Sequence, residues 1–437
     1  MTVTKTTMKT QTAGIAGVLL DGAPVDITFD GPLVDDVRPH QDGTVPVGHV
    51  DLRGYTVLPA TADPHAHLDK SRSWDLVDPP VGDLPGAVAA WAAAASGFTE
   101  DDILARAHDT ALSMLAAGTT AVRTHVDVYP DTTSGSAGPT GTKPDAFRGV
   151  RALHRLRWEL SGVMTLQIVA LVAPSTPVTA VGALVAGALD AGADLVGGAP
   201  HLAGDPLAQT DALVDAAETH HVGCDLHIDE YTGTHHRTST IHRYAARVTG
   251  WPAGRDRAAG HCCHLADLAE LADPSELAAT TDELLAADMP VIALPATNLY
   301  LQDATSRAIA PLSVLRAKGV RVAAGGDNVA DPFNPTGRGD ALETAALLVT
   351  AAHQTPTEAL DLVTSDARNV MGLPPAGPTT GAVADLLCVR NPPNPTTTPP
   401  TTSLIAAAPC DRVVITAGRF VARTTSTTTF PHLRRTP

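Results

Sequence analysis

The sequence predicts an α/β fold: a (β/α)₈ TIM barrel with a small β-sandwich domain formed from both termini. The middle of the chain alternates helix-like and strand-like segments and supplies eight strands. No Gly-rich phosphate loop follows an early strand, as an open doubly wound sheet would require. Both ends of the chain are rich in short β-type runs separated by turns. We expect the composite β-domain at residues 1–58 plus 375–437 and the barrel at 59–374.

The two ends of the chain read as short strands. Near the N-terminus these are residues 17–22, 25–29 and 48–52, and the dipeptides Asp21-Gly22 and Asp42-Gly43 are typical of turns. Two further strand-like segments, 381–389 and 412–421, follow the last predicted helix. The Pro- and Thr-rich stretch 391–402 between them predicts a loop.

The middle of the chain gives clear signals for where its helices begin and end. Thr99 is a predicted N-cap, and Gly118 ends the helix that follows it. The last long helix is predicted to begin with Thr355 as N-cap and to end near Gly372. The loop at 130–144 is either a substrate lid or a surface connection. The eight predicted strands cover residues 60–65, 121–127, 166–171, 195–199, 223–227, 258–261, 291–295 and 320–327.

The amino-acid composition limits which cellular compartment and which partners we expect. The 437 residues are 44% hydrophobic, which is ample for a large core, and the net charge of -17 argues against nucleic acid or an anionic membrane as partner. The five cysteines form no Cys-x-x-Cys pair, which favours a reducing compartment. Residues 1–11 lack the apolar core of a secretory signal, and no apolar run is long enough for a bilayer. We expect a soluble cytoplasmic protein whose Ala/Val-rich helices would permit a homo-oligomer.

A candidate metal site begins at His65 and His67. Alternate residues of a strand point to the same side, so these two imidazoles can share one metal ion. His227, His261 and Asp327 stand at the ends of later predicted strands, where a barrel places its chemistry. A single buried histidine is more often satisfied by the backbone, but five such residues at the same end of a barrel indicate a site.

These motifs resemble the amidohydrolase superfamily and, within it, the cytosine deaminase-like branch. The resemblance extends over nearly the whole chain. The matching segments are His-Ala-His-Leu-Asp at 65–69, Arg-Thr-His-Val-Asp at 123–127, Leu-Gln-Ile-Val-Ala at 166–170, His-Ile-Asp-Glu at 227–230, Gly-His at 260–261 and Gly-Asp at 326–327, followed by Val329, Asp331 and Pro332.

The resemblance implies a mononuclear metal site and assigns its chemistry. One Zn(II) or Fe(II) ion would be bound by His65, His67, His227 and Asp327. Asp327 would also accept the proton of the attacking water, Glu230 would move a proton to the substrate, and His261 would orient the hydroxide or polarise the carbon under attack. No lysine ends the fourth strand, so a carbamylated-lysine site with two metals is not expected.

The substrate contacts implied by the resemblance depart from cytosine deaminases in part. Gln167 would read an amide edge of the substrate ring. Asn328 and Phe333 stand where that branch has a second acid and a tryptophan, so the substrate need not be cytosine itself, and Lys70 replaces a small polar residue. We therefore expect a small-molecule heterocycle as substrate.

Three functions remain open at this point. The first is an aminohydrolase that acts on a cytosine-like, amino-substituted N-heterocycle by attack of metal-bound hydroxide and releases ammonia. The second is a metal-dependent hydrolase of a cyclic amide or of a substituted-amine C–N bond. The third is a binding protein on a decayed barrel, and the presence of Glu230 beside a full ligand set argues against it.

Overall fold

The computed structural model describes residues 12–78, 82–130, 145–233, 238–270, 274–302, 308–391 and 400–427. The chain divides into two compact units, one formed by Met1–Ala60, Ala116–Gly118 and Ala376–Pro437 and the other by Thr61–Leu115 and Thr119–Pro375. The predicted loop at 130–144 lies outside the described residues from 131 onward. No helix in the described ranges combines the length and apolarity needed to cross a bilayer.

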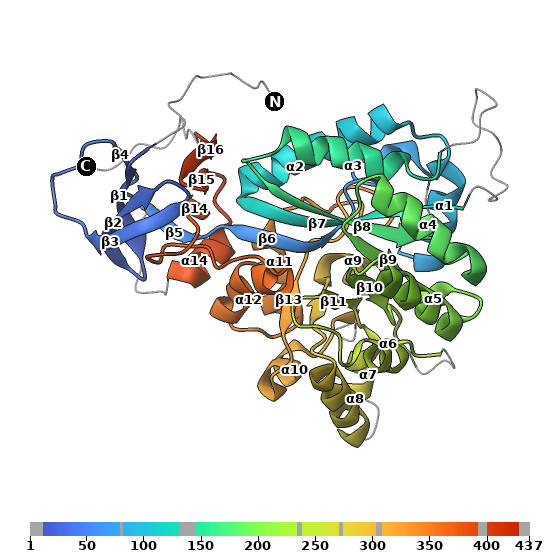
Figure 1. Cartoon of the computed structure of the whole chain (residues 1–437). Helices are drawn as coiled ribbons and strands as arrows, with labels where there is room; N and C mark the ends of the chain where they lie inside the picture. The colour runs from blue at the N-terminus through green and yellow to red at the C-terminus, as the bar shows by residue number, and fades with distance from the viewer. Residues whose placement is uncertain are drawn as a thin grey trace, which may run out of the picture. The chain divides into compact units, whose positions relative to one another are not determined.

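The larger unit is a parallel barrel surrounded by helices (Figure 1), and the predicted fold class is confirmed. Its eight strands are neighbours in chain order and pair in parallel. The strands are β6 (Thr61–Ala66), β7 (Thr119–Val128), β8 (Thr165–Val172), β9 (Leu195–Gly198), β10 (Cys224–Ile228), β11 (Arg257–His261), β12 (Val291–Ala293) and β13 (Val322–Ala324).

The first and last strands of the barrel meet through residues of the predicted site. The Asp327 N–H donates to the His65 carbonyl at 3.0 Å, and the His67 N–H donates to the Asp327 carbonyl at 3.1 Å. The Asp63 carboxylate accepts from the His65 N–H at 3.1 Å and from the Gly326 N–H at 3.1 Å. Closure of the barrel and placement of these side chains therefore depend on the same few residues.

The helices of this unit begin and end as the sequence predicted, with one exception. The Asp102 N–H donates to Thr99 Oγ1 at 3.2 Å, and Thr355 forms a complete capping box with Glu358. The predicted last helix is nevertheless two helices, because Thr364 has a non-helical backbone. The helices are α1 (Leu84–Ala95), α2 (Glu100–Ala117), α3 (Arg148–Glu159), α4 (Val178–Asp190), α5 (Pro206–Thr219), α6 (Ile241–Val248), α7 (His264–Glu270), α8 (Pro274–Ala286), α9 (Pro295–Leu301), α10 (Leu312–Lys318), α11 (Ala341–Ala351), α12 (Pro356–Leu362) and α13 (Ser365–Val370).

The smaller unit is a β-domain built from both ends of the chain. Its strands form one continuous sheet around a core that includes Ile15, Ile27 and Ile415. Strands β3 and β5 match none of the predicted ranges, and β3 carries two adjacent charged residues, Asp35 and Asp36. The segment predicted as one strand at 412–421 is two strands, β15 and β16, joined by a turn at residues 417–418. The expected loop at 391–402 is wrong at its end, where Pro400 begins a helix in the first-turn position that proline tolerates. The elements are β1 (Gly14–Leu20), β2 (Ala23–Asp30), β3 (Leu33–Pro39), β4 (His49–Asp51), β5 (Tyr55–Pro59), β14 (Leu386–Arg390), α14 (Pro400–Ala407), β15 (Arg412–Thr416) and β16 (Arg419–Thr424).

Candidate active site

The predicted histidines and Asp327 gather at the carboxyl end of the barrel strands. His65 lies in β6 and His67 directly after it, so the alternation of strand side chains turns both rings to the same side. His227 lies in β10, His261 is the last residue of β11, and Asp327 stands three residues after β13. All five are buried, with 6% or less of each residue exposed.

The ring nitrogens of three histidines face one another. His227 Nε2 lies 3.2 Å from His65 Nε2 and 3.1 Å from His67 Nε2, and His67 Nε2 lies 3.3 Å from an Asp327 oxygen. Burial is the main cause that lowers the pKa of His65 and of His227 well below the usual value, so both imidazoles are neutral. Lone pairs that face one another at this distance repel unless a cation lies between them.

This donor set fits a divalent metal ion. Nitrogen ligands about 2.1 Å from an ion lie about 3.0–3.4 Å from each other at right-angled or tetrahedral geometry, which agrees with the two nitrogen–nitrogen distances. His67 Nδ1 lies 3.1 Å from the His125 carbonyl oxygen. A proton on Nδ1 then leaves the lone pair of Nε2 free for the ion.

Two further histidines border the same point. Potential ligand atoms of His65, His125 and His227 lie within 4.8 Å of one another, as do those of His65, His261 and Asp327. The His125 ring stacks on His65 with centroids 3.9 Å apart.

Unusual backbone conformations aim these side chains. His261 and Asp327 have φ values of 66° and 60°, in the left-handed region that residues other than glycine seldom adopt. Gly260 permits the approach of the first strand, because a Cβ there would lie 2.8 Å from His65 Cε1. The local strain is retained where the side chains must point inward.

A buried carboxyl stands beside the histidines. Burial, with the nearby charge of Asp327, raises the pKa of Glu230 well above its usual value and so favours the protonated form of its carboxyl. Burial also tends to raise the pKa of Asp327, but interactions with His67 and His261 outweigh it and the net pKa is lowered. Two carboxyl groups with opposite shifts are the pairing that acid and base roles require.

Asn298, on α9, holds this acid and a histidine together. Its Nδ2 lies 2.9 Å from His261 Nδ1 and 3.4 Å from Glu230 Oε1. Burial lowers the pKa of His261 to about 4, so the ring is neutral, and an amide donor at Nδ1 places its proton on Nε2. The sequence carried no motif at Asn298, so this residue was missed.

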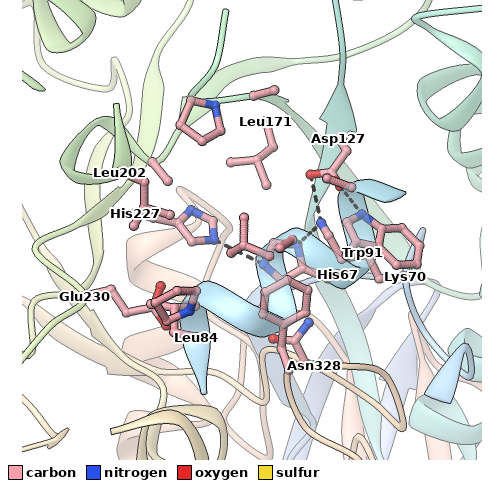
Figure 2. Close-up of a pocket in the computed structure, with 18 of the residues that line it drawn as sticks. His67, Lys70, Leu84, Trp91, Asp127, Leu171, Leu202, His227, Glu230 and Asn328 are labelled. Carbon is pink, nitrogen blue, oxygen red and sulfur yellow. Dashed lines mark hydrogen bonds and ion pairs between the residues drawn. The ribbon is translucent and has the colours of Figure 1, made fainter. Parts of the chain in front are cut away.

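A cavity of about 300 Å³ opens onto these groups (Figure 2). Its polar lining includes His67, His227, His261, Glu230 and Asp327. The cavity therefore presents the Glu230 and Asp327 carboxyls and the converging imidazoles to one bound molecule.

Lys70 adds a buried ammonium to the cavity wall. Its Nζ lies 2.9 Å from Asp127 Oδ1, and the other oxygen of Asp127 accepts from Trp91 Nε1 at 2.6 Å and from the Tyr129 hydroxyl at 2.9 Å. Burial tends to lower the pKa of Lys70, but the charges of Asp127 and Asp69 outweigh it and raise the pKa. The ammonium is thus a fixed, charged donor on the cavity wall.

Two of the three predicted substrate-contacting residues line the cavity, and one does not. Asn328 and Phe333 line the cavity, and the Asn328 amide donates to Asp331 at 2.8 Å. Gln167 does not, and this expectation is corrected. It is the third residue of β8, far from the carboxyl end, where its oxygen accepts from Arg123 Nε at 2.9 Å and its amide donates to the Met371 carbonyl at 3.0 Å. The part of β8 that lines the cavity begins at Leu171.

A barrel that gathers histidines, an aspartate and a buried carboxyl around one cavity has the groups that metal-assisted hydrolysis uses. Residues 171–422, more than half of the chain, match the family described as "Amidohydrolase family". The chain belongs to this family, and the expectation of a hydrolase acting on C–N bonds is confirmed.

Three known proteins show how far the similarity extends. The chain is 29% identical over 374 residues to a pterin deaminase of Rhizobium rhizogenes, covering 83% of this chain and 81% of that one. The structure of N-isopropylammelide isopropylaminohydrolase from Burkholderia multivorans is 27% identical with a TM-score of 0.73, covering 94% and 98%. The fold also matches 5-methylcytosine deaminase from Klebsiella pneumoniae with a TM-score of 0.80 and 22% identity, covering 96% and 99%.

Proposed function

We propose that this chain is a metal-dependent aminohydrolase that displaces an amino group from a small amino-substituted N-heterocycle and releases ammonia. The observation that carries the proposal is the position of the buried Glu230 carboxyl in the same cavity as the converging imidazoles and Asp327, with pKa shifts in opposite directions for the two carboxyls. Similarity to a pterin deaminase and to an aminohydrolase of a triazine ring supports the reaction class.

One divalent ion, Zn(II) or Fe(II), would be held by His65, His67, His227 and Asp327. Three imidazole nitrogens and a carboxylate suit both metals. When bound, the ion supplies Lewis-acid activation of water at neutral pH.

The chain's own residues supply the proton transfers. Asp327 is ionised and accepts a proton from the attacking water, while the Glu230 carboxyl donates one to the ring nitrogen beside the carbon under attack. A C–O bond forms, and the Glu230 carboxylate takes the remaining proton of the new hydroxyl and passes it to the amine. The exocyclic C–N bond then breaks, ammonia leaves with the ring carbonyl in its place, and the proton held by Asp327 is returned to Glu230. The Nε2–H of His261, set by Asn298, donates a hydrogen bond toward the developing negative oxygen.

A second candidate is hydrolysis of a C–N bond to a substituted amine. Its support is the 27% identity to an isopropylaminohydrolase over almost the whole of both chains. The same acid, base and ligand set would act, with an alkylamine as the leaving group. A cyclic amide, by contrast, would open without releasing any amine.

A panel of single compounds tests these proposals. Cytosine, isocytosine, pterin, ammelide and N-isopropylammelide are each incubated with purified protein of measured metal content. Ammonia or isopropylamine is then quantified together with the ring product. We expect amine release in proportion to bound metal from at least one compound. Complete absence of amine release by fully loaded, folded protein would refute the proposal.

A further inference from the structure

One face of α1 forms an apolar wall of the cavity. Leu84, Val88, Trp91 and Ala92 all line it, at the i, i+4, i+7 and i+8 spacing that places side chains on one side of a helix. The helix is fixed at its start, where the Asp83 carboxylate accepts from the Gly86 N–H at 3.3 Å. Leu84 and Val88 also pack with Leu301 and with Phe333, which lines the same cavity, so the position of the wall is fixed by its neighbours.

The end of β8 and the segment after β9 complete this apolar part of the cavity. Leu171, Val172, Ala173 and Pro174 line it from β8 onward, and Leu202 lines it after β9. Figure 2 shows Leu171, Leu202 and Leu84 around the same space as His227 and Glu230. We call the surface formed by Leu84, Val88, Ala92, Leu171 and Leu202 the apolar wall.

A single polar ring has too little apolar surface to cover the apolar wall. A six-membered amino-heterocycle carries nitrogen or oxygen atoms on most of its edges, and the histidines, Glu230, Asn328 and Lys70 already offer partners for them. Apolar surface that faces water in a pocket gives about 25 cal/mol per Å² to any apolar group that covers it. The wall therefore favours a ligand that has an apolar part beside its reacting ring.

We propose that the substrate carries an apolar extension, either a second fused ring or an alkyl group, which packs on the apolar wall while the reacting ring contacts the polar end. This inference rests on the proposed aminohydrolase function and specifies its substrate class. The extension can belong to the ring that is retained or to the amine that leaves. Matched pairs of probes separate these two sources.

Two pairs of probes test the inference. Isocytosine and 2-aminoquinazolin-4(3H)-one share the aminopyrimidinone ring, and only the second compound carries a fused benzene ring; ammelide and N-isopropylammelide differ only in the alkyl group on the leaving amine. We expect kcat/KM for the extended member of one pair to exceed that of its partner by about tenfold or more, since one buried methylene alone gives about fourfold. The pair that responds identifies the source of the extension. Single-ring members that react as well as the extended ones in both pairs would overturn the inference.

Substitutions on α1 locate the extension. Ala92→Phe fills space at the wall, and Ala93→Phe adds the same bulk one residue on, at an exposed position that does not line the cavity. We expect Ala92→Phe to lower the extended-to-single-ring ratio of kcat/KM about tenfold, mainly through KM, while Ala93→Phe keeps the ratio. Equal ratios in both variants, with unchanged melting temperatures, would place the extension elsewhere and refute the inference.

The outcomes separate this inference from the function on which it rests. Amine release from single-ring probes with no preference for extended ones retains the aminohydrolase and rejects the extension. No release by metal-loaded protein from any of these probes or from any compound of the panel above rejects both.

Discussion

Replacement of Glu230 by glutamine tests the acid without disturbing the fold. Glu230 is 4% exposed, and burial with the charge of Asp327 raises the pKa of its carboxyl, which favours the protonated form. Glutamine has the same size and the same zero charge, and its oxygen can still accept from Asn298 Nδ2 at the 3.4 Å site. We therefore expect the free energy of unfolding to change by less than about 1 kcal/mol.

The same substitution removes the transferable proton. A positioned acid–base group contributes about 10²–10⁴-fold to rate, which corresponds to about 2.7–5.5 kcal/mol of activation free energy. We expect kcat of Glu230→Gln to fall by this range with the bound metal unchanged. The increase in activation free energy should thus be several times larger than the change in the free energy of unfolding.

The assay compares kcat for amine release, metal content and thermal midpoint in three proteins. Glu343→Gln is the matched control, because Glu343 is a partly buried carboxyl on α11 with a burial-raised pKa and does not line the cavity. The control should retain full turnover. A Glu230→Gln protein that binds metal and turns over within about threefold of the wild type would show that Glu230 is not the acid.

Four further predictions follow from the same geometry. His227→Ala should reduce bound metal well below one ion per chain by elemental analysis, whereas His154→Ala, at an exposed position on α3, should not. Burial raises the pKa of Asp331 from 3.8 to about 7; the folded state then holds a proton that the unfolded chain has lost, so stability should fall as pH rises from about 4 to about 7. Denaturation at several pH values should show a shallower slope in Asp331→Asn. Gln167→Ala should lower the free energy of unfolding by about 1–2 kcal/mol in a denaturant titration and leave probe preference unchanged, because its amide bonds Arg123 and a backbone carbonyl. After chelation, the Asp327 and His67 amides should remain protected in hydrogen exchange, since backbone carbonyls accept them; exchange at the rate of a loop would contradict this.

The main features of the barrel and its polar end could be predicted because each follows from a short sequence pattern or from the general topology of a parallel barrel. Strand alternation turned His65 and His67 to one side, and the topology of a parallel barrel brought the ends of distant strands together. The capping box at Thr355 was equally local and is present. These signals need only a few adjacent residues to be recognised.

Gln167 shows where such reasoning failed. The motif identified the strand on which Gln167 lies but not the position of Gln167 along that strand. Leu171, the first residue of β8 that lines the cavity, is four positions further along the chain. Along a strand, four residues amount to about 13 Å, enough to move a side chain from the substrate to the interior of the barrel. Asn298 and the wall formed by α1 were missed for a different reason. Their roles arise from contacts between segments far apart in the chain, and no short pattern marks them.

The closure of the barrel explains why the site tolerates strain. Asp327 adopts a left-handed backbone, yet its N–H and its carbonyl are both bonded to the strand that carries His65 and His67. Those bonds set the height of the Asp327 carboxylate relative to both rings whether or not an ion is present. The backbone thus fixes the distance between the Asp327 carboxylate and its histidine neighbours, and the proposed metal ion would occupy a position that the closed barrel has already defined. Preorganisation of this kind is what lets a fixed dipole or charge stabilise a transition state without rearranging.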